Sequence, residues 1–145
     1  MKISTRGRYG LRAMLYLAVR YNRSVVSLNE ISEKEDISMN YLEQIFINLR
    51  KTELVTSVRG AKGGYSLSRP PSEISVSEIL NALEGSLSLV SCLDGDVCDQ
   101  ADSCATRILW KKMTEAMELV AQTTTLQDLL EDASINVSKR ACMLQ

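Results

Sequence analysis

Three cysteines in the second half of the chain are spaced in a way that could hold a metal cluster. Cys92, Cys98 and Cys104 follow one another in a C-x5-C-x5-C pattern. Thiolates are soft ligands that suit iron–sulfur chemistry. Zinc knuckles and dithiol redox motifs favour C-x2-C, so this spacing disfavours both. One loop with three thiolates could wrap around an iron–sulfur cluster. From the spacing alone, free thiols and disulfide-forming thiols remain open as alternatives.

The residue types disfavour a thiol enzyme. The chain contains no histidine, and histidine is the commonest base that activates a cysteine nucleophile. The glycine-rich segment over residues 59–64 lies between two predicted strands rather than before a helix, so it does not match a nucleotide phosphate-binding loop. We therefore expect that the protein is not an enzyme. A thiol enzyme or a small electron carrier is the alternative from another functional class.

Composition and termini predict a cytoplasmic protein. Of the 145 residues, 45% are apolar and 24% are charged, which is typical of a globular protein. No apolar run approaches the roughly 20 residues that span a bilayer, and the N-terminus has no apolar signal-peptide stretch. We expect no membrane partner. In the reducing cytoplasm, cysteines serve metal or redox chemistry more readily than structural disulfides.

A second group of side chains, in the first half of the chain, could bind nucleic acid. Residues 1–70 contain 12 Lys/Arg and 6 Asp/Glu, a net charge of +6, whereas residues 71–145 contain 5 and 12, a net charge of −7. Such asymmetry favours a polyanion partner, with chance segregation of solvated charges as the alternative. DNA binding needs cations for the phosphates and polar side chains for the base edges. The candidate DNA-binding residues are Arg6, Arg8, Ser38, Asn40, Tyr41, Glu43, Gln44, Arg59 and Lys62.

Helical periodicity predicts the elements that position these residues. Apolar spacing indicates a first helix over about residues 5–21, with Arg6, Arg8 and Arg12 near its start. The S-x-x-E pattern at 27–30 begins a short second helix. A third helix is expected over 39–51, with Ser38 as its N-cap. Its buried stripe is Leu42, Ile45, Phe46 and Leu49, and its other face carries Asn40, Glu43, Gln44, Ile47, Asn48 and Lys51. Two short helices, the second with a polar outer face, are typical of a helix-turn-helix.

A β-hairpin follows the third helix. Residues 54–58 and 65–68 are predicted as strands around the glycine-rich turn. This hairpin, or wing, carries Arg59 and Lys62 near its tip, where they could reach a neighbouring groove or its phosphates. On the reading helix, Gln44 could pair with adenine and Glu43 could accept from the cytosine amino group. Tyr41 and Ser38, at the helix start, could bind phosphate.

The second half of the chain is expected to be helical around the cysteines. A capping box at 75–78 begins one helix, which Gly85 should terminate. Residues 86–104 form the cysteine loop, a long helix follows over about 105–121, and Thr125 starts a short final helix. The fold class is therefore mainly α with a small β-wing. The last residues show no clear period, so we expect a loose tail that contains a spare cysteine, Cys142.

Three segments together carry a specific pattern: STRGRYGLRA over 4–13, S-x-x-YLEQ over 38–44 and RG-x-x-GGY over 59–65. This pattern resembles the Rrf2 family of bacterial transcription regulators, over about residues 1–130. The resemblance implies a winged-helix homodimer on double-stranded DNA, with the third helix in the major groove, the wing at the minor groove and the long helix pairing the subunits. A two-fold dimer favours a palindromic operator with half-sites about one helical turn apart.

The expected elements divide the chain into four regions, and the resemblance also implies a cofactor. The expected regions are a winged helix-turn-helix over 1–71, a connecting helix and cysteine loop over 72–104, a dimerisation helix and short C-terminal helix over 105–132, and a flexible tail over 133–145. The cysteine loop resembles the IscR-like branch, whose members hold a 2Fe–2S cluster with three such cysteines and a histidine three residues after the last. A 2Fe–2S cluster on Cys92, Cys98 and Cys104 is therefore implied.

The fourth ligand departs from the family's patterns. Arg107 stands at the histidine position, and a guanidinium has no lone pair to offer a metal. The NsrR-like branch uses an aspartate near the partner's N-terminus, where this chain reads Arg-Gly-Arg over 6–8. The open candidates are a partner carboxylate, an external thiol or water, or one of the loop aspartates Asp94, Asp96, Asp99 and Asp102. The predicted function is a DNA-binding regulator tuned by the cluster, and the alternative is a CymR-like, cluster-free regulator that responds to thiol oxidation or to a partner protein.

Overall fold

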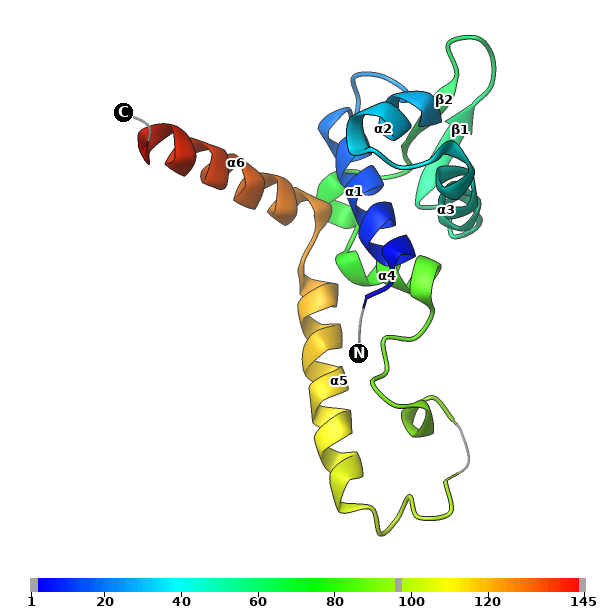
Figure 1. Cartoon of the computed structure of the whole chain (residues 1–145), viewed down its shortest axis with the longest axis vertical. Coiled ribbons are helices and arrows are strands. Elements are labelled where there is room, and N and C mark those ends of the chain that lie inside the picture. Colours follow the sequence, from blue (N-terminus) through cyan, green and yellow to red (C-terminus); the bar gives the residue numbers. More distant parts are fainter. Residues whose placement is uncertain (1–2, 96–97, 144–145) are drawn as a thin grey trace.

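The computed structural model (Figure 1) describes the backbone of residues 3–95 and 98–143, and the side chains of these residues as far as Ile135. The first elements are α1 (Thr5–Val19), α2 (Leu28–Glu35), α3 (Met39–Lys51) and an antiparallel pair, β1 (Val55–Val58) and β2 (Gly64–Leu67). After the turn η1 (Pro71–Glu73) come α4 (Val76–Glu84), the turn η2 (Ser91–Leu93), α5 (Ala105–Thr123) and α6 (Leu126–Met143). The fold class, mainly α with a small β-wing, is confirmed.

Two serine–glutamate pairs set the starts of α2 and α4. At α4, the Ser75 hydroxyl accepts from the Glu78 amide and the Glu78 carboxylate accepts from the Ser75 amide, so the predicted capping box is complete. At α2, Ser27 accepts from the Glu30 amide at 3.1 Å. The Glu30 carboxylate instead accepts from the Tyr16 hydroxyl at 2.7 Å. At α2, therefore, only one of the two capping-box hydrogen bonds forms, and the Glu30 side chain joins α2 to α1 instead.

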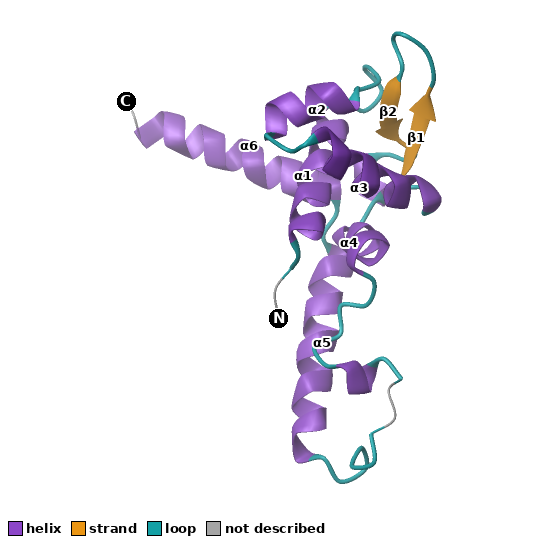
Figure 2. Cartoon of the chain, turned by 45° about the vertical axis from the view of Figure 1, so that its right-hand side comes forward, coloured by secondary structure: helices purple, strands orange, loops and turns teal. Residues whose placement is uncertain are grey.

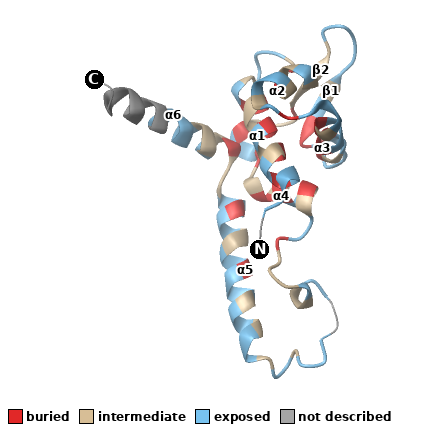
Figure 3. Ribbon diagram, in the orientation of Figure 1, coloured by how far each residue is buried: buried red, intermediate tan, exposed pale blue. Residues whose placement is uncertain are grey.

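The core of the head, residues 3–84, lies between α1, α2, α3, α4 and the wing (Figure 3). The predicted stripe of α3 is buried at all four positions, Leu42, Ile45, Phe46 and Leu49. From α1 and α2, Met14, Leu17 and Ile31 are buried against it. This apolar burial is the main favourable contribution to the stability of the head.

The wing is fastened to the head by backbone and ring contacts. Tyr65 on β2 exchanges two backbone hydrogen bonds with Val26, at 2.9 and 2.7 Å, in the segment before α2. Gly64 allows this close approach, because a Cβ there would lie 2.4 Å from the Val26 carbonyl oxygen. The rings of Tyr65 and Phe46 pack with centroids 4.7 Å apart. The wing base is therefore held against α3 while its tip extends away.

The second half of the chain leaves the head in two directions. Figures 1 and 2 show α5 running away from the head, with the cysteine loop at its far end, and α6 projecting to the side. The junction of α5 and α6 is tied back to the head, because the Val76 amide donates to the Thr124 carbonyl at 2.8 Å and the Leu126 amide to the Ile74 carbonyl at 3.0 Å. Within the described residues, no helix is both long enough and apolar enough to cross a membrane.

The C-terminal helix differs from the sequence prediction. We expected a short helix ending near residue 132 and a flexible tail over 133–145, but α6 continues to Met143. The predicted end is wrong because no glycine or proline follows Gly95 in the chain, so nothing in the sequence breaks the helix. Its start is fixed by reciprocal hydrogen bonds between Thr125 and Asp128. The side chain of Cys142 lies outside the described residues.

Candidate nucleic-acid interface and cysteine loop

The outer face of α3 presents polar side chains to solvent. Asn40, Glu43 and Gln44 are all exposed, on the side of the helix opposite its buried stripe. Within the part of the chain that the structure describes, none of these three side chains has a hydrogen-bond partner in the protein. Polar side chains that are exposed and unpaired can hydrogen-bond to base edges at no cost in protein contacts. The face has the chemistry that direct readout of DNA requires.

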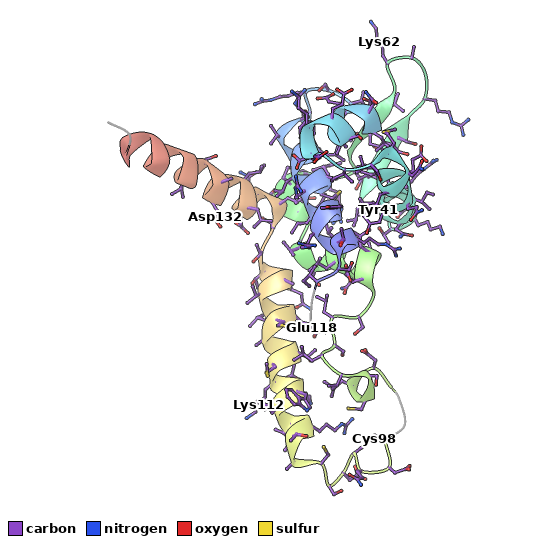
Figure 4. The ribbon with its side chains drawn as sticks, viewed as in Figure 1. Tyr41, Lys62, Cys98, Lys112, Glu118 and Asp132 are labelled. Atoms are coloured by element: carbon purple, nitrogen blue, oxygen red, sulfur yellow. The ribbon has the colours of Figure 1, made fainter. Side chains whose placement is uncertain are left out.

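The start of α3 also offers polar groups. Ser38 is the N-cap residue, as predicted, but its hydroxyl makes no capping hydrogen bond and is exposed. Tyr41 is half-buried, with its ring edge-on to Tyr9 at 5.8 Å between centroids, and it is labelled in Figure 4. Tyr41 and Arg6 line one polar pocket together with Glu84. The fold therefore brings together two predicted phosphate-binding residues that lie far apart in the sequence.

The basic residues of α1 fall into two groups. Arg6 and Arg8 are exposed, and their side chains make no hydrogen bond or ion pair among the described residues. Arg12 pairs with the Glu35 carboxylate at 2.9 Å, donates to the Glu35 carbonyl at 2.8 Å and lies over the Tyr9 ring. Arg12 thus joins α1 to α2, whereas Arg6 and Arg8 keep their charges available for an anion.

The wing tip carries the remaining predicted cations. Arg59 and Lys62 are exposed, with no partner among the described residues. Figure 4 shows Lys62 at the tip, pointing away from the head. In Figures 1 and 2, the wing and α3 lie on the same side of the head. A duplex that contacts α3 would therefore also be within reach of the wing.

The three predicted metal ligands lie on one loop but are not gathered. Cys92 lies in η2 and is half-buried, Cys98 is exposed, and Cys104 is the half-buried residue before α5. Among the described residues, no cluster of three or more His, Cys, Asp or Glu side chains could hold a metal ion. Of the candidate fourth ligands, Asp94 accepts a hydrogen bond from Ser86 at 2.6 Å, Asp99 and Asp102 are exposed, and Asp96 lies outside the described residues.

Arg107 and Cys104 form a distinct polar corner at the start of α5. The Cys104 thiol lies 3.3 Å from the Thr106 hydroxyl oxygen. The pKa of the thiol lies below its ordinary value, because the thiol contacts the Thr106 hydroxyl, is hydrogen-bonded to the backbone at Arg107 and lies near the Arg107 charge. The Arg107 Nε atom is buried and has no hydrogen-bond partner among the described residues. A buried N–H group without an acceptor lowers the stability of the fold. The side chains of Cys104 and Arg107 line a pocket together with Asp102.

Glu84, a residue that the sequence analysis did not single out, connects the end of α4, where the cysteine loop begins, to the start of α1. Glu84, the last residue of α4, accepts a hydrogen bond from the Gly7 amide at 2.8 Å and another from the Ser4 hydroxyl. One turn further along α1, a Cβ at Gly10 would lie 2.1 Å from Leu83. The spacing of the two glycines was the available signal, because small residues on one helix face permit close packing. Their partner could not be identified from the sequence.

A large apolar surface remains uncovered along α5. Side chains of α5 that are exposed and apolar are Ile108, Leu109, Met113, Leu119 and Val120. Beside them lies an apolar pocket whose lining includes Ile3, Leu11, Leu80, Leu87 and Met117. Large exposed apolar patches mark interaction sites more often than ordinary surface. Lys112, on the same helix, points to solvent (Figure 4).

The chain is similar to known proteins over most of its length. The sequence profile of the Rrf2 family, described as an iron-dependent transcriptional regulator, matches residues 3–132. The HTH-type transcriptional regulator IscR of Sodalis glossinidius is 38% identical over 135 residues, which cover 93% of this chain and 82% of that protein. Among solved structures, the global cysteine regulator CymR of B. subtilis has a TM-score of 0.78 at 41% identity, covering 89% of this chain and 95% of that chain. T. potens IscR has a TM-score of 0.75 at 42% identity, covering 92% and 88%.

Proposed function

The chain belongs to the Rrf2 family of transcriptional regulators, and on that premise we propose that its head binds promoter DNA and that an iron–sulfur cluster on the cysteine loop tunes this binding. The observation that carries the DNA-binding part is the exposed, unpaired polar face of α3 beside a cationic wing. We place this function in the cytoplasm, where a bacterial regulator meets its promoters.

In this proposal some side chains of the head contact the bases and others contact the phosphates. Helix α3 enters the major groove, where Asn40, Glu43 and Gln44 face the base edges. Glutamine pairs well with adenine, and glutamate accepts from the cytosine amino group. The phosphate contacts come from Arg6, Arg8, Ser38 and Tyr41. The cations Arg59 and Lys62 reach the adjacent minor groove, where they meet its negative potential.

We further propose that two copies of the chain pair through α5. The exposed apolar side chains of α5 support this, because removing apolar surface from water stabilises a complex with a partner. A two-fold pair would present two copies of α3 to the duplex, so the operator would be palindromic, with half-sites about one helical turn apart.

Two features of the cysteine loop suit an iron–sulfur cluster. Cys92, Cys98 and Cys104 supply thiolates, the ligands that such clusters prefer. The buried Arg107 Nε lacks an acceptor in the described structure, and a thiolate or sulfide beside Cys104 would supply one. Since the three thiols do not converge, the loop would have to close around the cluster. When bound, the cluster would supply one-electron redox chemistry, and we propose the 2Fe–2S type.

The fourth ligand is proposed to come from outside the cysteines. The candidates are a carboxylate of a partner subunit, an external thiol or water, and the loop carboxylates Asp94, Asp96, Asp99 and Asp102. Arg107 is excluded as a ligand because its guanidinium offers no lone pair, so we assign it the role of a hydrogen-bond donor to the bound sulfur.

We propose that the cysteine loop is coupled to DNA binding by the head through α4, which connects the two in sequence. The cysteine loop begins directly after α4, and Glu84 at the end of α4 holds the start of α1, which carries Arg6 and Arg8. Binding or loss of the cluster would shift the arrangement of the basic helix start. A coupling of about 1–3 kcal/mol is enough to change DNA occupancy roughly 5- to 150-fold.

The second candidate function is a cluster-free regulator. It is favoured by the similarity to the solved CymR structure, which matches the fold as well as T. potens IscR does. Anaerobic purification separates the two. We expect a coloured protein with iron and sulfide, unchanged in Cys142→Ser and colourless in Cys92→Ser or Cys98→Ser. A colourless wild-type protein without iron or sulfide would favour the cluster-free regulator and leave the DNA-binding proposal intact.

A further inference from the structure

Ile47 is an apolar residue on the polar face of α3. Its side chain is 55% exposed, whereas the adjacent Ile45 and Phe46 are 0% and 1% exposed. It is not among the side chains that pack against the core. An exposed isoleucine alone is unremarkable, because apolar atoms contribute more than half of an ordinary protein surface. Its position on the helix is what gives it meaning.

The position follows the spacing of a base-reading stripe. Relative to Asn40, the residues Glu43, Gln44 and Ile47 stand at i+3, i+4 and i+7, so the four side chains share one face of α3. The same spacing relates the four base-contacting positions on the recognition helix of homeodomains. All four side chains are exposed here. Any duplex edge that lies along Asn40, Glu43 and Gln44 therefore also lies against Ile47.

The chemistry of Ile47 selects one feature of the major groove. Its side chain has no donor or acceptor, so it cannot take part in hydrogen-bonded readout. The C5-methyl of thymine is the apolar group on the major-groove edge, and apolar side chains are its partners. We infer that Ile47 contacts a thymine methyl group in the operator and makes that position of the site specific for thymine. This inference rests on the proposed DNA binding.

The surroundings of Ile47 favour DNA over a protein as its partner. Arg50 and Lys51 are exposed on the next turn of α3, and cations beside an apolar group suit a phosphate-lined groove. The large apolar surface of the molecule lies elsewhere, along α5. A single isoleucine among polar and cationic side chains offers too little area for a protein interface, which needs on the order of 1,000 Å².

The test is a cycle that removes one methyl group from the DNA and the side chain from the protein. A duplex selected by the full-length wild-type protein is made with each thymine in turn replaced by deoxyuridine, which lacks only the C5-methyl. Affinities of wild type and Ile47→Ala are measured for every duplex. Alanine is a strong helix former and the site is exposed, so α3 should remain folded. Ile135→Ala is the matched control, since Ile135 is 51% exposed on α6.

We expect one thymine position per half-site at which loss of the methyl weakens wild-type binding about fourfold, the factor that corresponds to burial of one methyl group. The Ile47→Ala variant should bind the two forms of that duplex equally, while Ile135→Ala should behave as wild type. The inference is overturned if Ile47→Ala stays as sensitive as wild type at every thymine, or if wild type is insensitive throughout. Failure to select any duplex would instead overturn the DNA-binding proposal, and this inference with it.

Discussion

The carboxylate of Glu84 accepts a hydrogen bond from the backbone amide of Gly7, with 2.8 Å between Oε1 and the nitrogen. The last residue of α4 thereby caps the first turn of α1, although the two residues lie far apart in the chain. The Gly7 amide, which also donates to the hydroxyl of the N-cap residue Ser4 at 3.3 Å, is one of the amides that a helix start leaves unpaired, and Glu84 adds a negative charge at the positive end of the helix dipole. It also joins the element that leads into the cysteine loop to the element that carries Arg6 and Arg8.

Removal of this cap should weaken both stability and DNA binding. For Glu84→Ala we expect the free energy of unfolding to fall by about 1 kcal/mol, the usual loss for a helix cap. Affinity for promoter DNA should fall about fivefold, the lower end of typical coupling. Glu84→Gln keeps an acceptor oxygen and should lose less of both. Urea unfolding and anisotropy titrations measure the two effects, and a Glu84→Ala variant equal to wild type in both would refute the role.

The wing cations should control the salt dependence of binding more than its sequence preference. Replacement of Arg59 by alanine removes one phosphate or minor-groove contact, so the slope of log affinity against log salt should fall by about 1. The ratio of operator to random-sequence affinity should change little. Lys112→Ala, on α5, removes the same charge far from the wing and should leave the slope unchanged. If the salt dependence of Arg59→Ala equals that of wild type, Arg59 does not contact the DNA.

The periodic parts of the fold could be predicted from the sequence. The bounds of α3 and its buried stripe followed from helical spacing, and the capping box at Ser75 and Glu78 was recognisable because both partners lie within one turn. The sequence does not predict the end of α6, because the weak periodicity of the last residues indicates a loose tail there. The Glu84 cap was missed because it depends on tertiary packing. The cysteines could be placed on one loop, but the path of a loop, and hence the distances between thiols, is not encoded in spacing.

The pH dependence of stability should contain a contribution from Glu78. Burial raises the pKa of its carboxyl, but hydrogen bonds from Arg69 and Ser75 and the Arg69 charge outweigh burial, so the pKa lies below its ordinary value of 4.5. A lowered folded-state pKa means that the charged form stabilises the fold. This contribution is present above pH 4.5 and is lost as pH falls through the folded-state pKa.

Glu78→Gln should therefore unfold more readily than wild type near neutral pH, and the difference should narrow in acid. Urea unfolding across this range measures it. Glu73→Gln, an exposed carboxylate whose side chain has no hydrogen bond among the described residues, should show little difference at any pH. A Glu78→Gln deficit that stays constant down to strong acid would contradict the assignment.

A charge on the apolar face of α5 should separate the proposed dimer. Val120 is 65% exposed in the single chain, so Val120→Glu should leave the fold of each subunit intact. If a partner covers this face, the carboxylate would be buried without a partner at a cost of several kcal/mol. Sedimentation at low concentration should show a dimer for wild type and a monomer for the variant. Gln122→Glu, at an exposed polar position of α5, is the control, and a Val120→Glu dimer as tight as wild type would rule out this interface.

The central claim is that the basic head binds a duplex and the cysteine loop adjusts that binding. The most direct measurement is a competition titration of full-length protein against native promoter fragments and random duplex, with the cluster loaded anaerobically and then removed by a chelator. We predict preferential binding to at least one promoter fragment, and an affinity that changes roughly fivefold or more between the two states. Equal affinity for promoter and random DNA in both states would contradict the account.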